Sequence, residues 1–194
     1  MTNKLARIES NTLGMLLFLV NEAVFFALLI IAYINYRNSV TSGPNAANSL
    51  EPLTTSIFTA ALLASSFTVW RADKSLEKRN HTGMLLWLVA TIVLGLVFLI
   101  GQGSEYLRLL TNNVTVSRNL FGTTFFTLTG FHGFHVFVGL IMLSILAGIA
   151  ATGRFKGPRS GALSAISLYW HFVDIVWIFI FSIIYIWTAG LIKL

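Results

Sequence analysis

Cysteine is absent from this chain of 194 residues, and charged residues make up only 10% of it. The lack of cysteine excludes disulfide bonds, iron–sulfur clusters and thiolate metal sites. The scarcity of charge goes with a hydrophobic content of 56%, which lies far outside the usual composition of soluble domains. The composition therefore predicts an integral membrane protein.

Proline is scarce as well, with Pro44, Pro52 and Pro158 the only three. All three fall in expected connections or at a helix start, so no apolar run is broken by one. Five apolar runs are long enough to cross a bilayer as helices. The predicted fold class is all-α: a polytopic membrane protein whose single domain, residues 1–194, is a bundle of five transmembrane helices. The expected helices cover residues 13–36, 53–71, 83–107, 120–151 and 163–191.

Basic residues give the chain a net charge of +6. They lie in the short segments between apolar runs, where they act as topology signals, and this placement argues against nucleic-acid binding. One set of alternate connections carries nine Lys and Arg residues, and the other set carries four. Because cytoplasmic loops are enriched in positive charge, the N-terminus is predicted to be cytoplasmic and the C-terminus outside. The first run is too long for a signal peptide and holds Glu22 in its middle.

Ionisable side chains inside the apolar runs need an explanation, because each costs roughly 2.5–3.5 kcal/mol at a bilayer centre even on the lenient insertion scale. The helix rise places Glu22, His135 and Asp174 close to the middle of their helices. His132 lies three residues before His135, and His171 three before Asp174, so each pair shares a helix face. Packing of the first, fourth and fifth helices is expected to bond Glu22 to His135 or to a neighbouring hydroxyl.

These five intramembrane groups admit three hypotheses. The plainest is that they only hold the bundle together, at about 0.6–2 kcal/mol per contact. A metal site is the second, since His-x-x-His and His-x-x-Asp supply suitable ligand types, but both pairs would have to converge. The third is proton exchange at Glu22, a role that a buried carboxyl group can fill as readily as a structural hydrogen bond. We expect no metal in this chain.

Polar residues at the helix ends form two further groups. Gln102 and Glu105 are three residues apart near the outer end of the third helix and are expected to lie at the membrane interface. A basic rim is expected at the cytoplasmic end, where it would bind the headgroup of an anionic phospholipid unless its residues only set the topology. The headgroup candidates are Lys74, Lys78, Arg79, Arg154, Lys156 and Arg159.

Five motifs follow one another along nearly the whole chain. They are LLFLVNEAVFF at 16–26, LLASS at 62–66, QGSEY at 102–106, GTTFFTLTGFHGFHV at 122–136 and YWHFVDIVW at 169–177. In this order they resemble the subunit III family of haem-copper cytochrome c oxidases, in its short five-helix bacterial form. The first two helices of the longer seven-helix form are absent, so any lipid cleft must be built from these five helices or with a wall from another subunit.

The resemblance implies a non-redox subunit of a proton-pumping terminal oxidase in the bacterial inner membrane, which passes electrons from cytochrome c to oxygen. Its implied roles are to stabilise subunit I, support proton uptake and bind phospholipid. Implied partners are subunits I and II, membrane phospholipid and, indirectly, cytochrome c, with the haems and copper in the partner subunits. The residues agree, since those haems and that copper need about six histidine ligands and this chain has four. No catalytic centre is expected in this chain.

Three alternatives stay open. Quinol-oxidase relatives typically have Asp at the position of Glu22 and Phe-Trp-His where this chain has Tyr-Trp-His. Accessory subunits of nitric oxide reductases tend to carry Met at the position of Phe172. A stand-alone proton-coupled transporter using Glu22 and Asp174 is the last alternative, but the chain shows no inverted repeat and no spans broken by Gly or Pro in matching halves.

Overall fold

The computed structural model describes four stretches of the chain, residues 10–36, 50–117, 120–152 and 161–187. Within these stretches the chain forms five long helices and no strand. Each of the five is long and apolar enough to cross a membrane. The predicted all-α fold with five transmembrane helices is therefore confirmed.

The described helices begin and end close to the predicted boundaries, with two extensions, and residues 188–191 of the last predicted helix lie outside the described residues. α3 continues beyond residue 71 and α4 beyond residue 107. The predicted bounds followed the apolar runs, whereas both helices continue into the polar residues that come after those runs. α4 begins at His81, and the Oδ1 of Asn80 caps the helix by accepting from the Gly83 N–H at 2.8 Å. The elements are α1 (Ser10–Tyr36), α3 (Pro52–Glu77), α4 (His81–Thr111), α5 (Leu120–Ala151), α6 (Gly161–Phe181) and the π-helical turn η1 (Ser182–Trp187).

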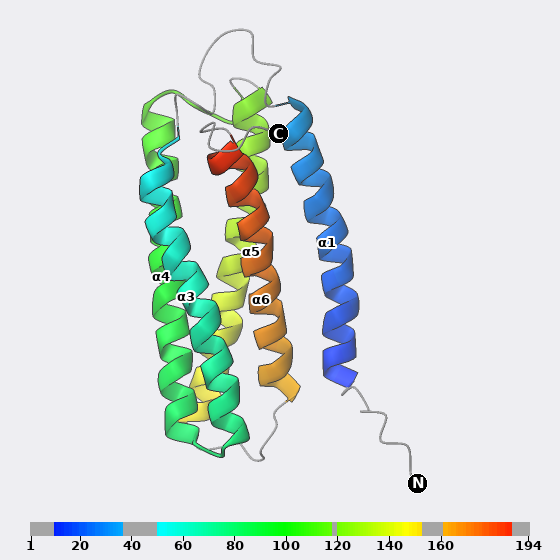
Figure 1. The fold of residues 1–194 in the computed structure, drawn as a ribbon, viewed down its shortest axis with the longest axis vertical. Coiled ribbons are helices and arrows are strands. Elements are labelled where there is room, and N and C mark those ends of the chain that lie inside the picture. Colours follow the sequence, from blue (N-terminus) through cyan, green and yellow to red (C-terminus); the bar gives the residue numbers. More distant parts are fainter. Residues whose placement is uncertain (1–9, 37–49, 118–119, 153–160, 188–194) are drawn as a thin grey trace.

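Successive helices run in alternate directions (Figure 1). The start of α1 therefore lies at the same end of the bundle as the turn between α3 and α4, and η1 ends at the other. α1 stands at the side of the bundle, where it packs against α5 and α6, whereas α3 and α4 pack along each other. α5 and α6 each contact three other helices, α5 packing against α1, α4 and α6, and α6 against α1, α3 and α5.

Trp170 of α6 is fully buried where α4 and α5 present glycines. A Cβ atom at Gly95 of α4 would lie 2.9 Å from the indole ring, and one at Gly139 of α5 would lie 2.8 Å from it. The two glycines thus leave space for the indole ring of Trp170 between α4 and α5. Small residues are the usual means by which membrane helices approach closely, because packing rather than water exclusion drives their association.

Two indole N–H groups join α6 to α3. Trp170 Nε1 donates to Ser65 Oγ at 2.9 Å, and Trp177 Nε1 donates to Thr59 Oγ1 at 3.0 Å. The tryptophans are seven residues apart, which places them on one face of α6 two turns from each other. Their bonds fix both the rotation and the register of α6 against α3.

Gly139→Ala is expected to destabilise the bundle, because its new methyl group would enter the indole ring of Trp170 and force a shift in a closely packed core. Overpacking of this kind costs about 1–3 kcal/mol. The measurement is the midpoint of thermal unfolding of the purified protein in mild detergent. Gly148→Ala on the same helix is the matched control, since nothing lies within 4 Å of a Cβ there. Equal midpoints for both variants would contradict the close packing of Trp170.

Candidate functional site: polar clusters within the membrane helices

Glu22 of α1 is hydrogen-bonded to His135 of α5, one of the two kinds of partner that the matching depths predicted. Glu22 Oε2 lies 3.0 Å from His135 Nε2, with 20% and 11% of the two side chains exposed. His135 Nδ1 lies 2.7 Å from the carbonyl oxygen of Phe131, and because a carbonyl only accepts, Nδ1 carries a proton. The contact with Glu22 then requires one further proton, held by either Nε2 or the carboxyl group.

An apolar groove of about 410 Å³ borders this pair between α1 and α5. Phe18, Phe25 and Phe131 are among the side chains that line it. Glu22 therefore lies at the edge of an apolar surface and keeps its carboxyl group turned to the histidine. The arrangement lets one proton be shared between two side chains that would each be costly alone at this depth.

Ser66 of α3 joins His171 and Asp174 of α6. The Ser66 hydroxyl donates to Asp174 Oδ2 and lies 3.0 Å from His171 Nδ1. A hydroxyl has one proton, so Nδ1 must be the donor in the contact with His171. Asp174 is 3% exposed, and its Oδ1 has no hydrogen-bond partner among the described residues. The shared face of His171 and Asp174 was predicted; Ser66 was not, and its only signal was its place in the LLASS motif.

His132 has different surroundings from His135, although both lie on one face of α5. Its ring is fully buried and stacks on Trp177, with centroids 4.7 Å apart and planes inclined by 26°. Neither ring nitrogen has a hydrogen-bond partner in the described part of the chain. The pairs His132/His135 and His171/Asp174 do not converge, and across the described residues no three His, Asp or Glu side chains gather as a metal-ligand set.

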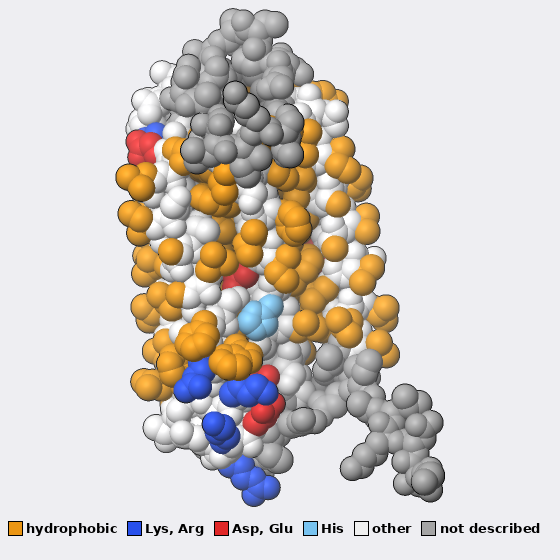
Figure 2. Space-filling model, in the orientation of Figure 1, with side chains coloured by type: hydrophobic (Ala, Val, Ile, Leu, Met, Phe, Trp, Pro, Cys, Tyr) orange, Lys and Arg blue, Asp and Glu red, His pale blue; other side chains and the backbone are white. Residues whose placement is uncertain are grey.

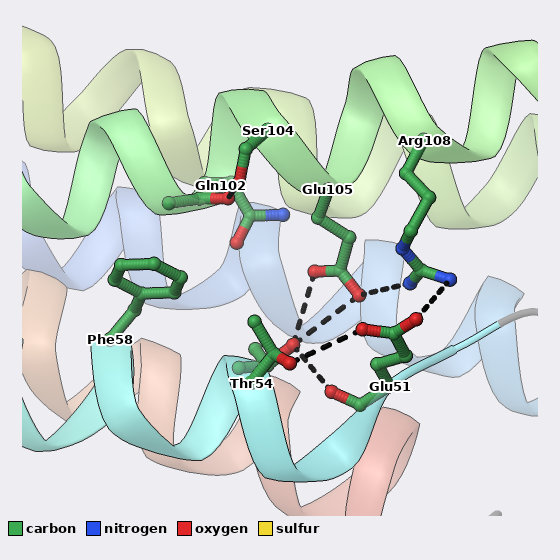
Figure 3. Close-up of a pocket in the computed structure, with 9 residues that line it drawn as sticks. Glu51, Thr54, Phe58, Gln102, Ser104, Glu105 and Arg108 are labelled. Carbon is green, nitrogen blue, oxygen red and sulfur yellow. Dashed lines mark hydrogen bonds and ion pairs between the residues drawn. The ribbon is translucent and has the colours of Figure 1, made fainter.

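Glu105 is the centre of a polar cluster at the end of the bundle where α3 begins (Figure 3). Tyr185 of η1 donates to its Oε2 at 2.7 Å, and the Thr55 hydroxyl lies 3.3 Å from both of its oxygens. Arg108 Nη2 lies 3.6 Å from Glu105 Oε1, and Arg108 Nη1 lies 3.2 Å from Glu51 Oε1. The structure thus ties α3, α4 and η1 together at one carboxyl group.

Gln102 and Glu105 lie near the end of α4, where the sequence placed them, but neither side chain is open to its surroundings. The two residues are only 5% and 7% exposed, because α3 and η1 cover this face of α4. The sequence showed their spacing along α4 but not which neighbouring helices would cover them. Thr55 and Tyr185, which bond Glu105, were not predicted, since neither lies in one of the five motifs.

The basic rim is described in part. Lys78 and Arg79 are exposed, and Lys74 Nζ is paired with Glu77 Oε2 at 2.9 Å. Arg71, which was not among the headgroup candidates, lies 5.3 Å from the ring centroid of Trp87. Figure 2 shows these charges gathered at one end, below a belt of apolar side chains. The remaining candidates, Arg154, Lys156 and Arg159, lie outside the described residues.

The fold and these clusters define a class: a multi-pass helical membrane protein whose intramembrane acidic and histidine side chains bond across helices. The sequence profile of the family described as "Cytochrome c oxidase subunit III" matches residues 4–189. The chain therefore belongs to the cytochrome c oxidase subunit III family.

Named relatives extend over most of the chain. Cytochrome c oxidase subunit 3 of Thermostichus vulcanus is 35% identical over 93% of this chain and 89% of its own length. The probable cytochrome c oxidase subunit 3 of Mycobacterium leprae is 36% identical over 90% of this chain and 86% of its own length. The subunit 3 of Pongo pygmaeus is 36% identical over 91% of this chain but only 69% of its own length. The chain thus spans a larger share of these two bacterial relatives than of the Pongo pygmaeus protein.

Ser66→Ala is expected to lower the free energy of unfolding by about 1–3 kcal/mol, because it leaves Asp174 and His171 without their shared partner in a buried site. The matched control is Ser56→Ala on the same helix, whose exposed hydroxyl bonds only to the Pro52 carbonyl at 2.6 Å and whose loss should change stability by less than about 0.5 kcal/mol. Chemical unfolding in mixed micelles gives both values. Equal effects would show that Ser66 does not support the pair on α6.

Proposed function

We propose that this chain is the non-redox subunit III of a bacterial haem-copper terminal oxidase, bound to subunits I and II, in which haems and copper carry electrons from cytochrome c to oxygen. The observation that carries the proposal is the family match over residues 4–189, which includes all five helices. The histidines support it, since His132 stacks on Trp177, His135 bonds Glu22 and His171 bonds Ser66. Each is engaged in holding helices together.

The proposed role is to stabilise subunit I and to support proton uptake by the complex. α1 is suited to contact a larger subunit, because it stands at the side of the bundle and exposes apolar side chains along its length. The Glu22–His135 pair supports the proton-related role, since it holds a proton that either atom can carry. Ser66 with Asp174 and His171 offers a second hydrogen-bonded group in the membrane, on the other side of α6.

Phospholipid binding and orientation complete the proposal. The end of the bundle that carries Arg71, Lys78 and Arg79 would face the cytoplasm, in agreement with the distribution of positive charge over the whole chain. Exposed cations next to an apolar belt suit the headgroup of an anionic phospholipid, each contributing about 1 kcal/mol near a charged membrane surface. The N-terminus would then be cytoplasmic and the C-terminus outside.

Mild detergent extraction of the tagged chain from its native membrane is expected to bring down haem absorbance and oxygen consumption driven by reduced cytochrome c. The measurement is the reduced-minus-oxidised spectrum of the purified material, with an unrelated tagged five-helix protein as control. A chain that purifies without haem would contradict the proposal in favour of a transporter. Oxygen consumption driven by quinol in place of cytochrome c would assign the chain to a quinol oxidase. Reduction of nitric oxide in place of oxygen would assign it to a nitric oxide reductase.

Glu22→Ala is expected to leave the helix inserted and the complex assembled but to shorten the number of turnovers before activity is lost, by several-fold. Glu22→Gln should shorten it too, because an amide keeps a hydrogen bond to His135 but has no exchangeable carboxyl proton. Oxygen consumption followed over many turnovers gives the measurement, with the exposed Glu77→Gln as the control. An unchanged lifetime in Glu22→Ala would show that Glu22 contributes only to packing. An unchanged lifetime in Glu22→Gln alone would show that its hydrogen bond to His135 matters and its carboxyl proton does not.

A further inference from the structure

A pocket of about 220 Å³ opens between the first turns of α3 and the last turns of α4. Figure 3 shows Gln102, Glu105 and Arg108 reaching into it from α4. Phe58 of α3 borders it, as does Glu51, the residue just before that helix. It lies at the opposite end of the bundle from the basic rim, so a ligand bound here is distinct from the anionic lipid proposed above.

The charges around this pocket favour a ligand with a cationic group. Glu51 and Glu105 both face the one guanidinium of Arg108, which they share at 3.2 and 3.6 Å. Glu51 is half exposed, so its carboxylate is open to a second cation from the mouth of the pocket. A primary ammonium is suited to this position, since each of its three N–H groups can donate to a carboxylate or hydroxyl oxygen.

Gln102 requires that the same ligand also carry a hydrogen-bond acceptor. Its side chain is 5% exposed and lines the pocket, yet its Nε2 has no partner among the described residues. A buried amide nitrogen without an acceptor is unfavourable and is rarely left so in proteins. A phosphate oxygen placed near Gln102 and Arg108 would meet both donors, while the ammonium stays with Glu51.

The surroundings indicate that the ligand is attached to apolar chains. The pocket lies at helix ends, where lipid headgroups are found, and highly exposed apolar residues directly precede residues that line it, Thr54, Phe58 and Gly101. The exposed residues are Leu53 at 80%, Ile57 at 65% and Ile100 at 70% exposure. Acyl chains can lie against them along the helices while the headgroup enters the polar pocket.

We propose that the pocket between α3 and α4 binds the headgroup of phosphatidylethanolamine, with the primary ammonium at Glu51 and the phosphate at Gln102 and Arg108. Phosphatidylcholine, whose quaternary ammonium donates no hydrogen bond, fits less well. Phosphatidylglycerol has no cation and would meet the two carboxylates unfavourably. The site thus distinguishes lipids by the N–H donors of the headgroup amine rather than by the net negative charge of the headgroup.

Native mass spectrometry of the purified, delipidated complex tests this selection, with the three lipids added in turn at equal concentration and with identical acyl chains. The chain released from the complex is expected to retain phosphatidylethanolamine roughly tenfold more than phosphatidylcholine, the ratio that corresponds to losing one charge-assisted hydrogen bond. Equal retention of these two lipids, or preference for phosphatidylglycerol alone, would overturn the proposal.

Two variants locate the site. Glu51→Gln removes the charge that faces the ammonium, and Gln102→Met removes the unpartnered amide at nearly constant volume; each is expected to lower phosphatidylethanolamine retention roughly tenfold. Glu77→Gln at the basic end is the matched control and should retain the lipid fully. Gln102→Met without an effect, together with a higher unfolding midpoint, would show that the amide is merely unsatisfied. Haem absorbance of the purified variants is measured alongside lipid retention. Because it reports whether the oxidase is assembled, a failure of the proposed function can be distinguished from a failure of the lipid site.

Discussion

The hydrogen bonds from the two indole N–H groups of α6 to α3 set the geometry on which the other contacts depend. Trp170 reaches Ser65 and Trp177 reaches Thr59, so the helices are fixed in both rotation and register. In that register the next residue of α3, Ser66, meets His171 and Asp174. Because lipid offers no hydrogen bonds, a small slip between these helices would leave several polar groups unpaired at once.

Polar contacts are spread along α6 and η1 and each leads to another helix. Tyr169 donates to the His135 carbonyl on α5 at 2.9 Å, which holds the helix that carries the partner of Glu22. At the far end Tyr185 reaches Glu105 on α4. α6 and η1 together therefore bond to α3, α4 and α5, while α1 is bonded to α5 through Glu22 and His135. These contacts use the aromatic and polar residues that occur together in the sequence of α6 and η1.

The same arrangement accounts for the proposed role in a larger oxidase. Its acidic and histidine side chains are used to join helices and to hold protons at fixed positions, while α1 leaves an apolar surface at the side of the bundle. The Lys and Arg side chains of the described residues lie near the two ends of the bundle. A bundle held together in this way suits the proposed position beside a neighbouring subunit that performs the redox chemistry.

The sequence by itself determined the class of protein, the number of helices and the similar depths of Glu22 and His135, because apolar run length and depth along a helix follow directly from composition and the 1.5 Å rise. The structure then selected His135, of the partners predicted for Glu22. It also carried the motifs by which the family was predicted. Only the tertiary structure decided that Gln102 and Glu105 are buried, that Ser66 joins the pair on α6, and that His132 and His135 serve different neighbours. Sequence spacing gives positions on one helix face, whereas partners depend on how helices rotate and pack against one another.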